Sequence, residues 1–171
     1  MNDYVALAIV DAEKYQKTNV KIIEELIQDK VPGVYVTLNR PYESIKRVFE
    51  KEKIDLTNVI FIDAVTKTVG GKVTKTNECL FIGSPEDLSD ISIAMDQAVM
   101  AIPKKDKFVF FDSLSTLLLY NNVGVVAKFV HFISGKMRTW KVKGIIISLR
   151  RDVDKDLIEQ LKSYCDVTLE L

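Results

Sequence analysis

Short runs of apolar residues recur along the chain, and polar segments with a different apolar spacing separate them. The runs show no strict alternation of apolar and polar positions, which is typical of strands buried on both faces of a parallel sheet. They lie at Val5–Val10, Val34–Leu38, Val59–Ile62, Phe108–Phe111 and Gly144–Ser148, and we expect two further strands at Cys79–Ile82 and Val167–Leu171.

Between these runs, apolar residues recur every three or four positions, which predicts amphipathic helices. Thr18 is expected to cap the first helix, and Pro32-Gly33 to stop it. Pro41 opens the second helix, and Ser84–Asp87 offers a cap, a proline and two acids to begin the third. The last two helices are expected around Val126–Met137 and Leu157–Tyr164.

Strands that alternate with helices predict βαβ units with right-handed crossovers. We therefore expect an α/β fold, a three-layer α/β/α sandwich with a mostly parallel sheet. The 171 residues contain no linker and no repeat, so we expect a single domain over 1–171. The stretch Val65–Thr76 stands apart, because two polar arms flank Gly70-Gly71 and predict an exposed hairpin or loop.

Composition narrows the classes of partner. Basic and acidic residues balance at 24 each, which argues against a nucleic acid and against an anionic membrane surface. One histidine and two distant cysteines argue against a zinc site, and we expect no metal. No apolar stretch reaches membrane length and no secretory signal precedes the first run, so we expect a cytoplasmic protein.

Asp112 is the first candidate for chemistry. It ends the run Phe108–Phe111 and is followed by Ser113-Leu114-Ser115. In open α/β sheets, ligands bind beyond the carboxyl ends of the strands. A single acid in this place holds Mg²⁺ in many nucleotide hydrolases. A structural role is the alternative, in which Asp112 bonds Ser113, the nearby backbone or Lys17.

The order of a strand, a loop, Lys17-Thr18, a helix and later a strand ending in Asp112 resembles the RecA superfamily. The likeness is greatest to KaiC-type ATPases, which are common in archaea, and it covers nearly the whole chain. It implies a P-loop NTPase-like sheet and a site for ATP with Mg²⁺ at Lys17, Thr18 and Asp112. The stretches that carry it are Tyr35–Leu38, Pro41–Ile45, Val59–Ala64, Ser84–Ile91 and, as the Walker B strand, Phe110–Ser115.

The departures from this family are equally informative. The family's Gly-x-x-x-x-Gly-Lys-Ser/Thr loop wraps the β-phosphate with backbone N–H groups, but only Lys17 and Thr18 match it here. Asp11 and Gln16 hold the places of the two glycines that bring the backbone close to phosphate. The Walker A motif is therefore degenerate, and we expect no bound cofactor, with ATP and Mg²⁺ as the alternative.

A second departure concerns the base that activates water. In the family, a glutamate follows the strand that matches Tyr35–Leu38, whereas this chain has Asn39 and Arg40. Neither side chain takes up a proton at neutral pH. Loss of both the phosphate loop and the base favours a member that does not hydrolyse ATP.

Three functions remain open. The first is a regulatory or interaction module, active in signal transduction through contact with a protein, either a second copy or an active KaiC-like relative. The second is a nucleotide enzyme in which Lys14, Lys17 and Asp112 hold the phosphates. The third is a phospho-receiver, with Asp11 and Glu13 as its acidic metal pair and Asp112 as the acceptor. The sequence favours the first.

Several other polar residues have an ordinary structural interpretation. Asp63 ends a strand and is expected to be a loop acid. Arg150-Arg151 follow another strand and are expected to be solvated, although such a pair can reach a neighbour's nucleotide in RecA-type rings. Lys67, Lys72 and Lys75 lie in the polar stretch around Gly70-Gly71, which lacks aromatic residues for stacking on bases.

Overall fold

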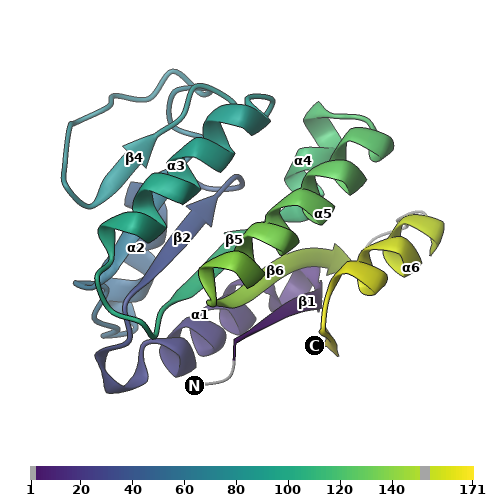
Figure 1. Ribbon diagram of the computed structural model, residues 1–171. Coiled ribbons are helices and arrows are strands. Elements are labelled where there is room, and N and C mark those ends of the chain that lie inside the picture. Colours follow the sequence, from purple (N-terminus) through teal and green to yellow (C-terminus); the bar gives the residue numbers. More distant parts are fainter. Residues whose placement is uncertain (1–2, 151–154) are drawn as a thin grey trace.

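The computed structural model describes residues 3–150 and 155–171. Its centre is a seven-stranded sheet in the order β4-β3-β2-β5-β6-β1-β7 (Figure 1). Every neighbouring pair of these strands is parallel. The strands are β1 (Tyr4–Asp11), β2 (Gly33–Thr37), β3 (Val59–Asp63), β4 (Cys79–Phe81), β5 (Phe108–Asp112), β6 (Lys143–Arg150) and β7 (Val167–Glu170).

Helices cover both faces of the sheet, which makes the three-layer α/β/α fold. One face packs against α1 and α2, and the other against α3, α4, α5 and α6. The helices are α1 (Tyr15–Leu26), α2 (Tyr42–Lys51), α3 (Leu88–Ala101), α4 (Leu114–Tyr120), α5 (Val123–Trp140) and α6 (Lys155–Tyr164), with short 3₁₀ turns at Ala12–Lys14 and Gln28–Lys30. The predicted α/β fold with a parallel sheet is confirmed.

The sheet creates two apolar cores, one on each face. Alternate residues of a strand point to opposite faces, so Phe108 and Phe110 of β5 enter the core under α1 and α2. Val109 and Phe111 enter the other core, beside Met95 of α3. All five residues of β5 are buried, which explains why its sequence shows no polar alternation.

The beginning of the first helix differs from the prediction. Thr18 does not cap it, since α1 begins at Tyr15 and a 3₁₀ turn at Ala12–Lys14 precedes it directly. The stretch after β1 holds no glycine and several good helix formers, so the chain turns into a helix at once. The same helix ends at Leu26, several residues before Pro32-Gly33.

Two other local predictions need correction. The third helix begins at Leu88, because Ser84–Asp87 forms a turn closed by a bond from the Asp87 N–H to the Ser84 oxygen. Of the two structures predicted for Val65–Thr76, the hairpin is absent, and residues 67–75 form an exposed loop. Gly70 takes the expected positive φ of 72°, but the turn closes onto Thr66 and the two arms do not pair. Polar arms have no apolar face to bury, so nothing holds them together.

No helix in the described part of the chain combines the length and the apolar character that crossing a membrane requires.

Candidate functional site

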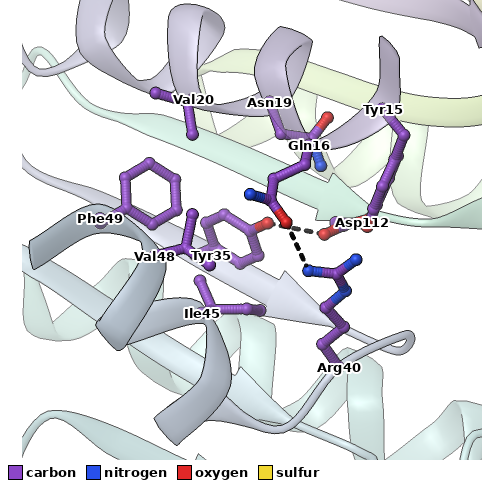
Figure 2. Close-up of a pocket in the computed structure, with 10 residues that line it drawn as sticks. All are labelled: Tyr15, Gln16, Asn19, Val20, Tyr35, Arg40, Ile45, Val48, Phe49 and Asp112. Atoms are coloured by element: carbon purple, nitrogen blue, oxygen red, sulfur yellow. Dashed lines mark hydrogen bonds between the residues drawn. The ribbon is translucent and has the colours of Figure 1, made fainter. Parts of the chain in front are cut away.

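Asp112 lies at the carboxyl end of β5, and two tyrosine hydroxyls bind its carboxylate (Figure 2). Tyr15, the first residue of α1, donates to Oδ1, and Tyr35 of β2 donates to Oδ2 over 2.6 Å. β2 and β5 are neighbouring strands, and their register sets Thr37 beside Asp112. Only 1% of Asp112 is exposed, so the two hydroxyls take the place of water around its charge.

A small cavity adjoins this group of residues. Its volume is about 20 Å³, which is enough for a single water molecule. Asn19 of α1 lines it and is buried, and its Oδ1 has no hydrogen-bond partner among the described residues. At the exposed side, the Arg40 guanidinium donates to Gln16 Oε1 over 2.8 Å, as Figure 2 shows. The other lining residues are Val20, Ile45, Val48 and Phe49.

Burial shifts the pKa values of Asp112 and of the two tyrosines bonded to it. It raises the pKa of Asp112 to about 6, although the bonds from Tyr15 and Tyr35 and the nearby Arg40 charge lower it in part. Burial, together with the Asp112 charge, also holds the pKa of both tyrosines far above its usual range. The tyrosine hydroxyls therefore keep their protons and act as donors at any physiological pH.

Lys17 and Thr18 do not join Asp112. Both lie within α1, and neither lines the Asp112 cavity, whereas Gln16 and Asn19 of the same helix do. A helix turns by about 100° per residue, so Lys17 faces away from the side that carries Asn19. The Lys17 side chain is exposed. The structure thus does not bring Lys17 and Thr18 together with Asp112 around this cavity.

The residues in the places of the two family glycines have partners of their own. Asp11 pairs with the Arg150 guanidinium at 2.8 Å and with the Lys14 ammonium at 3.5 Å. Gln16 is held by Arg40. Arg150 is thus tied to its own chain, and Arg151 lies outside the described residues.

A phospho-receiver site is not supported by this geometry. Asp112 is buried beneath Tyr15, while Asp11 is engaged by Arg150. Within residues 3–150 and 155–171, no group of three or more acidic, histidine or cysteine side chains is placed to hold a metal ion.

Asp63, at the end of β3, has a structural role. Its carboxylate accepts bonds from the N–H groups of Val65 (2.7 Å), Thr66 (2.8 Å) and Tyr42 (2.8 Å), and from the Thr66 hydroxyl. Tyr42 is the first residue of α2, so Asp63 both caps that helix and shapes the turn after β3. Asp63 was expected to be a loop acid, but it is the fully buried last residue of β3, and its carboxylate supports the turn that follows.

Sequence reasoning missed Tyr15, Tyr35 and Asn19, the side chains that surround Asp112. The expected partners of Asp112 were Ser113, nearby backbone and Lys17, and none of these provides the bonds to its carboxylate. A signal was present in Tyr35, a residue with a polar end inside an otherwise apolar strand. A buried tyrosine hydroxyl needs a hydrogen-bond partner, and the acid ending a neighbouring strand supplies one.

Comparison with solved structures supports a KaiC-like fold. A KaiC-like protein, PH0186, from the archaeon Pyrococcus horikoshii OT3 superposes with a TM-score of 0.67 at 14% identity, covering 98% of this chain and 71% of its own. An uncharacterised protein from the same species, PH0321, solved in complex with an unknown peptide, gives a TM-score of 0.73 at 12% identity. That match covers 99% of this chain and 78% of the other.

No curated protein matches the sequence. The sequence model of one family, described as a family of unknown function (DUF7504), matches residues 24–171, which is most of the chain. The chain therefore belongs to this family of unknown function and has a KaiC-like, RecA-type α/β fold.

Proposed function

We propose that this chain is a RecA/KaiC-like ATPase-fold domain that does not hydrolyse ATP. It acts instead as a regulatory or protein-interaction module, and its proposed setting is signal transduction. The proposal rests on one observation: the hydroxyls of Tyr15 and Tyr35 donate hydrogen bonds to both carboxylate oxygens of the buried Asp112.

The coordination chemistry of Mg²⁺ explains why these two hydrogen bonds argue against a metal–nucleotide site at Asp112. Mg²⁺ in ATPase sites keeps several waters and is bound through one or two carboxylates together with substrate phosphates. Both oxygens of Asp112 are already bonded to tyrosine, and the adjoining cavity measures about 20 Å³. Pockets for small molecules usually have volumes of roughly 300–1,000 Å³. These residues do not fit ATP with Mg²⁺.

Residues 11–18, which stand in the place of the Walker A loop, also argue against a bound nucleotide. A phosphate is held where several N–H groups of a glycine-rich loop converge on it. Here the chain passes from β1 through a 3₁₀ turn straight into α1, and Lys17 faces solvent. The loss of the loop supports a degenerate Walker A motif.

The place of the water-activating glutamate supports the absence of hydrolysis independently. Asn39 is exposed and cannot act as a base. Arg40 carries a permanent positive charge and donates to Gln16. Neither Asn39 nor Arg40 offers a carboxylate to a water molecule at this end of β2.

The interaction role rests on the fold that remains once its catalytic parts are gone. PH0321, which shares this fold at 12% identity, was solved with a peptide. We propose that this chain likewise works through contact with protein, either a second copy of itself or an active KaiC-like relative. No nucleic acid or membrane partner is proposed.

Calorimetric titration tests the loss of nucleotide binding. ATP with Mg²⁺, and Mg²⁺ alone, are titrated into the whole chain up to about 1 mM, the upper end of ordinary KM values. We expect no binding heat, and no phosphate release above the rate of a protein-free control. Saturable ATP binding with Mg²⁺-dependent turnover, abolished by Lys17→Ala, would overturn the proposal and establish a nucleotide enzyme with a divergent loop.

A further inference from the structure

The strand β4 forms one edge of the sheet and has main-chain groups free for pairing. The Phe61 N–H donates to the Glu78 oxygen at 2.7 Å, and the Ile82 N–H donates to the Asp63 oxygen at 2.8 Å. Residues of a parallel strand alternate in the side to which their N–H and C=O groups point. The main-chain groups of Cys79 and Phe81 therefore face away from β3, toward the open edge.

A groove of about 310 Å³ with a mixed apolar and polar lining, named the apolar groove after the side chains at its strand and helix sides, lies beside this edge, on the face of the sheet that α3 covers. Leu80 and Ile82 line it from the strand side, and Ile93 and Ala94 from α3. Leu80 is 36% exposed and Ile93 is 55% exposed, although both are apolar. Its polar lining consists of Lys67, Asp90 and Gln97.

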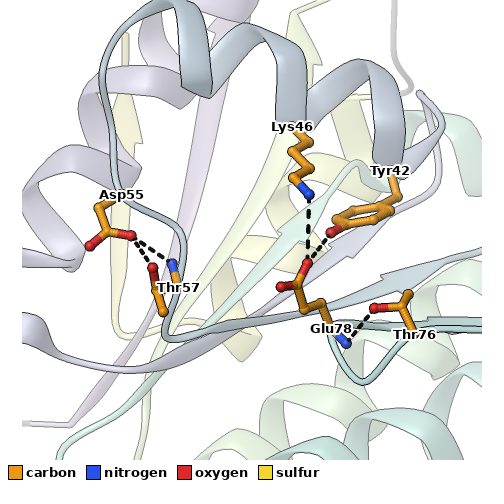
Figure 3. Close-up of polar contacts among 6 residues, drawn as sticks. All are labelled: Tyr42, Lys46, Asp55, Thr57, Thr76 and Glu78. Atoms are coloured by element: carbon orange, nitrogen blue, oxygen red, sulfur yellow. Dashed lines mark hydrogen bonds and ion pairs between the residues drawn. The ribbon is translucent and has the colours of Figure 1, made fainter.

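A second cavity, of about 200 Å³, lies near β4 on the opposite face, beneath α2. Three carboxylates line it, from Glu50, Asp55 and Glu78, against the single ammonium of Lys46. Glu78 is bonded by the Tyr42 hydroxyl at 2.7 Å and pairs with Lys46 at 3.7 Å, as Figure 3 shows. Glu50 and Asp55 are left as a net negative charge in this cavity.

The segment that leads into β4 does not pair with that strand. Residues 67–78 arch beyond β4 in Figure 1. Among the hydrogen bonds of the described residues, no main-chain bond joins 72–77 to β4. Lys67 is the one residue of 67–77 that lines the apolar groove.

We infer that the β4 edge binds an extended segment of a partner protein, which pairs with β4 as an additional strand. Side chains of an added strand point alternately to the two faces of the sheet. Those on the α3 face would enter the apolar groove, and those on the α2 face would meet Glu50 and Asp55. The partner segment therefore alternates apolar and basic residues. This inference rests on the proposed interaction role and names the surface and the partner.

Peptide selection tests the surface. A phage library of random peptides of about ten residues, enough for a strand of ordinary length, is selected against the whole chain. We expect enrichment of sequences that alternate apolar and basic residues. The best peptide is then synthesised and its affinity for the chain is measured. Ile93→Glu, which puts a charge into the apolar groove, should lower that affinity at least tenfold. Met100→Glu is the matched control, since Met100 lies two turns along α3, is exposed and does not line the groove.

Hydrogen exchange locates the bound peptide. Strand addition should slow exchange of the outward-facing amides at Cys79 and Phe81, and leave the amides of the other edge strand, β7, unchanged. Failure to enrich any peptide, or enriched peptides that bind Ile93→Glu and wild type equally, would overturn the inference. Nucleotide binding and turnover are measured in a separate experiment. ATP turnover by a chain that still binds the peptide would contradict the proposed loss of hydrolysis but not the binding of a strand at β4.

Discussion

The hydroxyl of Tyr35 donates a hydrogen bond of 2.6 Å to Asp112 across neighbouring strands of the sheet. Tyr35 is 2% exposed and Asp112 is 1% exposed, so no bulk water can replace this bond. The same tyrosine ring stacks on Phe61 at a centroid distance of 5.2 Å, which fixes the direction of its hydroxyl. An acid in the place of a Walker B aspartate is thus built into the core.

Removal of this hydroxyl should destabilise the fold without disturbing its packing. Tyr35→Phe keeps the ring but leaves Asp112 with one tyrosine donor, and a hydrogen bond to a charged group contributes about 1.5–3 kcal/mol. We expect a loss of that size in the free energy of unfolding, measured with urea at pH 7.5. Tyr120→Phe is the control, because Tyr120 is exposed. Equal stabilities of the two variants would contradict the role given to the Tyr35 hydroxyl.

The raised pKa of Asp112 predicts a pH dependence of stability. Burial raises this pKa from 3.8 to about 6. Between about pH 4 and pH 6 the folded chain holds a proton that the unfolded chain has lost. The contribution of Asp112 to stability is therefore greatest below pH 4 and falls as the pH rises through 6. At about 1.4 kcal/mol per pH unit, the fall amounts to roughly 3 kcal/mol.

Asp112→Asn removes this titration and isolates it from that of the other carboxylates. The difference in unfolding free energy between Asp112→Asn and wild type should shift by roughly 3 kcal/mol in favour of asparagine from pH 4 to pH 7. Urea denaturation at a series of pH values measures it. Stability curves that run parallel across this range would show that Asp112 does not titrate there.

Asp63 offers a contrasting case of an acid that only supports structure. Asp63→Asn would turn an amide N–H toward donors that now share the carboxylate, including the N–H of Tyr42. A buried donor left without an acceptor costs about 1–3 kcal/mol, and we expect that loss in urea denaturation. Asp55→Asn, at an exposed acid bonded within its own loop to Thr57, should change stability by less than about 0.5 kcal/mol. Similar losses for both would argue against a capping role for Asp63.

The sequence predicted the sheet well because its strands are buried on both faces. A run such as Val109–Phe111 has few alternatives to a central parallel strand, and its terminal acid marks the ligand end of the sheet. The order of the strands was not predictable in this way. It depends on contacts between distant segments, and only that order brings Tyr35 beside Asp112.

Local predictions failed where one pattern allowed two structures. Lys17-Thr18 fits the end of a phosphate loop and equally the first turns of a helix, and the absence of glycine favoured the helix. The symmetry around Gly70-Gly71 predicted a positive φ, which Gly70 takes, but the turn there spans Thr66–Gly71 and joins no strands. It could not show that the two polar arms lack a surface on which to pair.

Gly33, the first residue of β2, allows a close contact that a larger residue would prevent. A Cβ atom at this position would lie 2.4 Å from the ring of Phe108 on the adjacent strand. We expect Gly33→Ala to destabilise the fold by about 1–3 kcal/mol, because the fully buried ring has little room to move. In the double variant with Phe108→Leu, the combined loss should be smaller than the sum of the single losses by about 1 kcal/mol.

A second glycine gives the opposite expectation and serves as the control for Gly33→Ala. Gly135 lies on the exposed side of α5, and a Cβ atom there would meet nothing within 4 Å. Alanine is favoured over glycine inside a helix by about 0.8–1 kcal/mol, so Gly135→Ala should stabilise the chain by up to that amount. Thermal and urea unfolding of both variants measure the contrast. If Gly33→Ala proved as stable as Gly135→Ala, the result would contradict the inference that β2 packs closely against the Phe108 ring at Gly33.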